Sequence, residues 1–209
     1  MKAMTMPNIS QYIITALLLI SAATLLYSIS FYSNPFNQHQ FYGREINTPA
    51  PQFKLVNLNG ENIDSSMFKG RYTYLMFGYL NCTKTCHTQA LVLDALSKQL
   101  AHDNMVQYAY ISMDPKRDDS KRLQYYFKNK TQSLSILKGN NIKEIQAIAN
   151  QFNAPYSIQK ETDINYEIKH PAYLYLINPE GNLSLIYTGS VIDTHAIKKD
   201  LNIYKLKFS

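Results

Sequence analysis

Residues 72–86 read YTYLMFGYLNCTKTC, a run of apolar and aromatic residues that ends in two cysteines. Residues 72–79 show no regular polar alternation, which is typical of a strand buried on both faces of a sheet. The segment that follows carries leucines at near-helical spacing: Leu91, Leu93, Leu96 and Leu100. The two cysteines, Cys82 and Cys86, are therefore expected where a central strand turns into a helix.

The rest of the chain alternates between strand and helix patterns. A hairpin is expected within 51–64, about the turn residues Asn59 and Gly60. Further strands are expected at 106–112, 172–177 and 183–187, and helices after Asp119 or Ser120, at 140–152 and at 193–204. This order predicts an elaborated thioredoxin-like α/β fold, with a central mixed sheet flanked by helices.

The N-terminal part is apolar and almost without charge. No Asp, Glu, Lys or Arg lies between Lys2 and Arg44, and residues 13–29 are nearly all apolar. A helix of about 20 such residues spans a bilayer. The alternative is a cleaved signal peptide, because Ser28-Ile29-Ser30 resembles a cleavage site. The apolar run predicts a single-pass anchor in the inner (plasma) membrane. The positive charge at Lys2 predicts that the domain lies on the periplasmic or extracytoplasmic side.

These features predict three parts of the chain. Residues 1–32 are the membrane anchor, and residues 33–50, which are polar and show no periodicity, are expected to be a linker. Residues 51–209 form one domain of about 160 residues. The formal net charge of +6 is spread along the chain, which is not typical of a nucleic-acid-binding protein and suits membranes or acidic partners.

The chain has only two cysteines, and they are four positions apart, as C-T-K-T-C. In the first turn of a helix both thiols point to one face, and the helix N-terminus lowers their pKa. Thiolates at this spacing suit a redox dithiol or a soft metal ion, Cu(I) or Zn(II). The motif alone leaves these two readings and a structural disulfide open.

Two further segments contain polar residues close to predicted strand ends. His170 stands directly before the strand at 172–177, where a lone histidine is usually packed or solvated. Asp114, Pro115, Arg117 and Asp118 follow the strand at 106–112, and we expect them to form a turn and ion-pair network at the rim of the sheet. Tyr79, like most other tyrosines of the predicted strands, is expected to pack in the sheet, although it is close enough to the cysteines to line a docking face.

The combination of YLMFGYLNCTKTC, ISMDPKRD and IKHPAYLYLINPEGNL, in this order, resembles the Sco/SenC family of copper-delivery proteins. The resemblance covers residues from Pro51 to the end of the chain. It implies that Cys82, Cys86 and His170 are copper ligands. The chain departs from the family pattern in the residues beside the ligands: Thr83 and His87 stand in place of prolines, and Lys169 in place of an Asp.

The resemblance also implies a function. It predicts a metallochaperone that binds one copper ion, as Cu(I), Cu(II) or both, and delivers it to the binuclear copper centre of cytochrome c oxidase subunit II. An upstream copper donor or a thiol reductant is a possible further partner. The alternative is an exported thiol-disulfide reductase whose redox dithiol is Cys82 and Cys86. A peroxidase, and a copper sensor or scaffold, are further alternatives.

Overall fold

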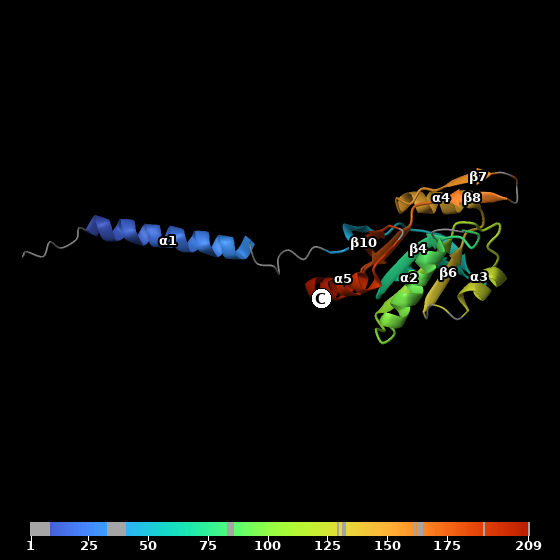
Figure 1. The fold of residues 1–209 in the computed structure, drawn as a ribbon, viewed down its shortest axis with the longest axis horizontal. Helices are drawn as coiled ribbons and strands as arrows, with labels where there is room; N and C mark the ends of the chain where they lie inside the picture. Colours follow the sequence, from blue (N-terminus) through green and yellow to red (C-terminus); the bar gives the residue numbers. More distant parts are fainter. Residues whose placement is uncertain are drawn as a thin grey trace, which may run out of the picture. The chain divides into compact units, whose positions relative to one another are not determined.

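The computed structural model describes residues 9–32, 41–82, 86–128, 130, 133–160, 162, 165–189 and 191–208. The chain divides into two compact units, Met1–Gln40 and Phe41–Ser209, which are drawn in Figure 1. Each unit is described by itself.

The first unit contains one helix, α1 (Ile9–Tyr32), within its described residues. Its residues 9–31 are apolar and free of acidic and basic side chains, and α1 is the one helix in the described chain long and apolar enough to cross a membrane. At 1.5 Å per residue its 24 residues extend about 36 Å, more than the ~30 Å of a bilayer core.

The second unit is built on an eight-stranded sheet in the order β1-β10-β9-β4-β5-β6-β2-β3. The strands are β1 (Arg44–Pro49), β2 (Lys54–Asn57), β3 (Asn62–Asp64), β4 (Tyr72–Gly78), β5 (Val106–Ser112), β6 (Leu134–Lys138), β9 (Tyr173–Ile177) and β10 (Asn182–Thr188). A separate two-stranded ribbon pairs β7 (Ser157–Lys160) with β8 (Tyr166–Lys169). The helices are η2 (Ser65–Phe68), α2 (Cys86–Gln99), α3 (Ser120–Phe127), α4 (Ile142–Gln151) and α5 (Thr194–Phe208).

Strand β4 lies in the middle of the sheet, between β9 and β5, and all seven of its residues are buried. Tyr74 and Met76 belong to the core cluster that also contains residues of α2, α3 and α5, whereas Leu75 and Phe77 belong to the cluster that contains residues of α4. Figure 1 accordingly shows α2, α3 and α5 on one side of the sheet, and α4 with the β7–β8 ribbon on the other. The apolar run in the sequence therefore reflects burial on two faces.

Strands β4 and β5 are parallel, and their ends coincide. Gly78, the last residue of β4, is paired with Ser112, the last residue of β5. The N–H of Met113 donates to the carbonyl of Gly78 at 2.8 Å, so the two chains are still adjacent as they leave the sheet. The segments that follow the two strands, 79–82 and 113–119, therefore meet at one edge of the domain.

The predicted strands at 72–79, 106–112, 172–177 and 183–187, the hairpin within 51–64 and the predicted helices are all present, with ends shifted by a few residues. The cap of α3 is Asp119, whose side chain accepts the N–H of Arg122. The prediction omitted β1, β6, β7 and β8.

The prediction of a linker over residues 33–50 is wrong for its last part. Residues 33–40 lie outside the described residues, but Arg44–Pro49 form β1, which pairs antiparallel with β10. The start of this strand is also held by α5, because the Asp200 carboxylate accepts the N–H groups of Tyr42 at 3.0 Å and Gly43 at 2.8 Å. The folded unit therefore begins before Pro51.

Candidate metal centre

The two cysteines lie at the junction that the sequence predicts. Strand β4 ends at Gly78, Cys82 follows four residues later, and Cys86 is the first residue of α2. Cys82 is 7% exposed, and its N–H donates to the carbonyl of Tyr79 at 3.4 Å. Residues 83–85 and the side chains of Cys86 and His87 lie outside the described part of the structure.

His170 directly follows β8 and is partly buried. Its Nδ1 lies 3.0 Å from the carbonyl oxygen of Pro171. When Nδ1 carries the ring proton and donates it to this carbonyl, Nε2 is the nitrogen whose lone pair is available to a metal ion.

Tyr79 contacts both segments that carry the predicted ligands. Its ring packs edge-on against the His170 ring, with centroids 5.9 Å apart and planes at 75°. Its hydroxyl accepts the N–H of Ile168 in β8 at 3.3 Å, while its carbonyl accepts the N–H of Cys82. Tyr79 is 3% exposed, which agrees with the expected packing in the sheet and not with a docking face. It connects the cysteine segment to the histidine segment instead.

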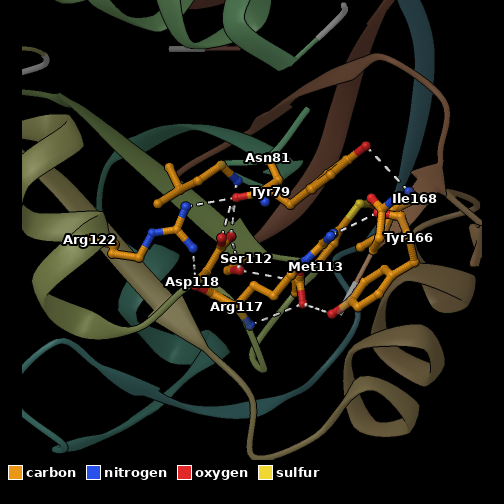
Figure 2. Close-up of polar contacts among 12 residues, drawn as sticks. Tyr79, Asn81, Ser112, Met113, Arg117, Asp118, Arg122, Tyr166 and Ile168 are labelled. Carbon is orange, nitrogen blue, oxygen red and sulfur yellow. Dashed lines mark hydrogen bonds and ion pairs between the residues drawn. The ribbon is translucent and has the colours of Figure 1, made fainter. Parts of the chain in front are cut away.

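A buried carboxylate holds the backbone that leads to Cys82. Both oxygens of Asp118 lie 3.2 Å from the N–H of Leu80, and Oδ2 also accepts the Ser112 hydroxyl at 2.7 Å (Figure 2). Burial raises the pKa of the Asp118 carboxyl from 3.8 to about 6, although the hydrogen bonds from Ser112 and Leu80 oppose this rise. Burial of Asp118 therefore makes the negative charge of its carboxylate energetically unfavourable.

The second carboxylate of this segment, Asp114, is fully buried and faces β8. It forms an ion pair with Arg117 and accepts the Tyr166 hydroxyl at 2.6 Å. The Arg117 guanidinium lies over the Tyr166 ring, 3.5 Å from its centroid, and donates to the Tyr166 carbonyl at 2.8 Å. The predicted ion-pair network is therefore confirmed for Asp114 and Arg117, whereas the Asp118 carboxylate accepts hydrogen bonds from Ser112 and Leu80.

Arg122, in α3, completes the contacts around the cysteine segment. Its Nη2 donates to Oδ1 of Asn81 at 2.7 Å, and its Nη1 donates to the Arg117 carbonyl (Figure 2). Asn81, Arg122 and Ser112 were not among the predicted site residues. Their roles depend on side-chain direction at the meeting of two parallel strands, and the sequence pattern carries no signal for that.

The structure thus brings Cys82 and His170 into contact with the same residue, Tyr79, and places Cys86 at the start of the adjoining helix. Among the side chains that the structure describes, no three His, Cys, Asp or Glu groups form a metal-binding cluster. The predicted donor set includes Cys86, whose side chain is not among them. Two thiolates and one imidazole are donors that suit copper.

The fold and the cysteine pair define the class of protein: a thioredoxin-like domain with two cysteines at the junction of a central strand and a helix. A family model described as SCO1/SenC matches residues 43–204. The chain belongs to the SCO1/SenC family.

Relatives and solved structures agree with this assignment. The SCO2-like protein of Rickettsia prowazekii is 30% identical over 181 residues, which are 83% of this chain and 87% of that protein. The structure of Arabidopsis thaliana ScoI with copper bound is similar with a TM-score of 0.68, at 24% identity, over 78% of this chain and 100% of that one. BsSco, described as having a disulfide switch and as a member of the Sco family of cytochrome c oxidase assembly proteins, is 25% identical, with a TM-score of 0.62, over 78% of this chain and 97% of that one.

Proposed function

We propose that this chain is a copper metallochaperone that binds one copper ion through Cys82, Cys86 and His170. Two thiolates with one imidazole form a three-coordinate Cu(I) site, and one or two further oxygen or nitrogen ligands adapt such a site to Cu(II). The copper-bound ScoI of Arabidopsis thaliana, which shares this fold, supports the choice of metal.

The observation that carries this proposal is the double contact of Tyr79. Cys82 and His170 are 88 positions apart in the chain, yet the carbonyl of Tyr79 accepts from Cys82 and its ring packs on His170. The placement of His170 beside the same tyrosine favours a shared ligand role.

We propose the binuclear copper centre of cytochrome c oxidase subunit II as the acceptor. BsSco, a related protein, is described as a cytochrome c oxidase assembly protein. In the transfer, thiolates of the acceptor replace Cys82, Cys86 and His170 one after another, so copper passes between proteins without release to water. We further propose that α1 anchors the chain in the inner membrane with the domain on the extracytoplasmic side.

The experiment is to mix the copper-loaded chain, in detergent, with the purified soluble domain of a copper-depleted, reduced subunit II. We expect copper to appear in the acceptor, measured by its visible absorption and by metal content after the proteins are separated. Copper that stays on the loaded chain, when free copper ions do load the same acceptor, contradicts the chaperone role.

A second candidate function is reduction of disulfides in exported proteins by Cys82 and Cys86. The disulfide switch described for BsSco favours it, since it shows that a related protein uses dithiol chemistry. The His170→Ala variant separates the two functions. A reductase keeps its turnover of a disulfide substrate in this variant, whereas a copper chaperone loses its metal.

A further inference from the structure

The contacts of the segment after β5 point to a role that is separate from metal ligation. Asp118 is fully buried, and its carboxylate accepts the backbone N–H of Leu80, two residues before Cys82, and the hydroxyl of Ser112. A carboxylate that accepts a backbone N–H forms a charge-assisted bond, roughly twice as strong as a neutral one. The Leu80 N–H is thereby fixed to the end of β5.

Arg122 holds the next residue. Its guanidinium donates to Oδ1 of Asn81, adjacent to Cys82, and to the carbonyl of Arg117. The guanidinium is presented from the first turn of α3, where Asp119 caps the helix by accepting the N–H of Arg122 at 2.8 Å. Leu80 and Asn81 are therefore each held by a side chain of the same short segment.

The other end of this segment holds the strand that leads to His170. Arg117 donates to the carbonyl of Tyr166, the first residue of β8, and Asp114 accepts the Tyr166 hydroxyl. Strand β8 ends at Lys169, one residue before His170. Residues 114–122 thus contact both chain segments that carry the proposed ligands.

We propose that Asp118 and Arg122 are positioning residues, which fix the segment before Cys82 relative to His170 and so set how long the site retains copper. This inference rests on the proposed function. Without the carboxylate, the partly buried Leu80 N–H loses its charge-assisted bond, and the segment before Cys82 is held less firmly. Outer groups that orient metal ligands are typically worth about 10-fold to 100-fold in metal affinity.

The test compares the full chain in detergent with its Asp118→Asn and Arg122→Gln variants. Each protein is loaded with copper, and the loss of copper to a competing chelator is followed over time. We expect copper loss about 10-fold to 100-fold faster in both variants, with a shifted thiolate-to-Cu(II) charge-transfer band. A merely structural role does not move this band.

The matched control is Asp200→Asn. Asp200 is also a buried carboxylate that accepts backbone N–H groups, but its bonds go to Tyr42 and Gly43 at the start of β1. We expect this variant to lose stability and to retain copper as the unaltered protein does. Release rates and spectra of Asp118→Asn and Arg122→Gln equal to those of the unaltered protein overturn the positioning role and leave the copper site standing.

A second readout separates this inference from the proposed function. In a Cys86→Ser background, the rate at which iodoacetamide alkylates Cys82 reports the freedom of the loop without any metal. We expect about 10-fold faster alkylation in Asp118→Asn and not in Asp200→Asn. If the unaltered protein retains no copper, the proposed function fails, but the alkylation rates still test the positioning role. Equal alkylation rates in the Cys86→Ser protein and in its Asp118→Asn and Asp200→Asn variants overturn that role.

Discussion

At the scale of single residues, the environment of Asp118 opposes the negative charge of its carboxylate. It is fully buried, and burial raises the pKa of its carboxyl from 3.8 to about 6. This rise corresponds to about 3 kcal/mol, by which folding disfavours the ionised form. The carboxylate keeps its place because Ser112 and Leu80 donate hydrogen bonds to it.

This cost predicts a specific pH dependence. Between pH 4 and about 6 the folded protein holds a proton on Asp118 that the unfolded chain has already released, so the free energy of unfolding falls as pH rises through this window. Asp118→Asn has no such proton. We expect the stability of the unaltered protein relative to this variant to decrease by about 2 kcal/mol from pH 4 to pH 7, measured by urea unfolding. A difference that is constant over this range contradicts the assignment.

Tyr79 provides the second prediction at this scale. Tyr79→Phe keeps the ring against His170 but removes the hydroxyl that accepts the Ile168 N–H. A buried donor without an acceptor costs about 1 to 3 kcal/mol, which thermal unfolding detects. Tyr108→Phe is the control, because the buried Tyr108 hydroxyl has no hydrogen-bond partner within the described structure. An equal effect of the two substitutions would argue against the Tyr79 hydrogen bond.

At the scale of elements, the close pairing of β4 with β5 brings the site together. Gly78 ends β4, and a Cβ atom at this position would lie 3.0 Å from Cε2 of Tyr110 on β5. Tyr110 is buried and packs on Phe127, with ring centroids 4.8 Å apart, so it has little room to move. The absence of a side chain at Gly78 therefore lets the two strands leave the sheet side by side.

We expect Gly78→Ala to lower the free energy of unfolding by about 1 to 3 kcal/mol, because the added methyl group overpacks the core. The measurement is chemical denaturation, alone and in combination with Tyr110→Leu. If the contact with Tyr110 is the cause, the double variant loses less than the sum of the two single variants. Strict additivity would show that the contact is not responsible.

The sequence predicts those elements whose pattern is local. The continuous apolar run of β4 and the leucines of α2 identify the strand, the helix and the cysteine junction between them. Strand β1 was missed because its residues are mostly exposed at the edge of the sheet and show no alternation. Strand β6 was missed because it is short and its pairing partners, β5 and β2, lie far away in the sequence. The β7–β8 ribbon was missed because each of its strands has only four residues.

The site residues also divide into those that a local pattern predicts and those that depend on contacts between distant segments. Cys82, Cys86 and His170 were selected by motif and resemblance, and the network of Asp114, Arg117 and Asp118 by its place after a strand. The connecting function of Tyr79 and the contact of Arg122 with Asn81 could not be predicted. They arise where segments distant in the sequence meet, and their residue types are common at many other positions.

At the scale of the whole molecule, the two units predict where the chain can be divided. A fragment that starts at Phe41 keeps β1 and the bonds of Asp200 to Tyr42 and Gly43, whereas a fragment that starts at Pro51 loses them. We expect the longer fragment to be released from membranes and to stay folded, and the shorter one to unfold about 10 °C lower. Thermal unfolding of both fragments is the measurement. Equal midpoints would place the boundary of the domain at Pro51 after all.

The central claim is that one copper ion binds to Cys82, Cys86 and His170. Its most direct test is anaerobic copper titration of the reduced full chain in detergent, with bound metal counted after desalting, beside the variants Cys82→Ala, Cys86→Ala and His170→Ala. We predict one retained copper ion per chain, lost in each of the three variants, with an unchanged circular dichroism spectrum. No retained copper in the unaltered protein, or full retention in His170→Ala, contradicts the claim.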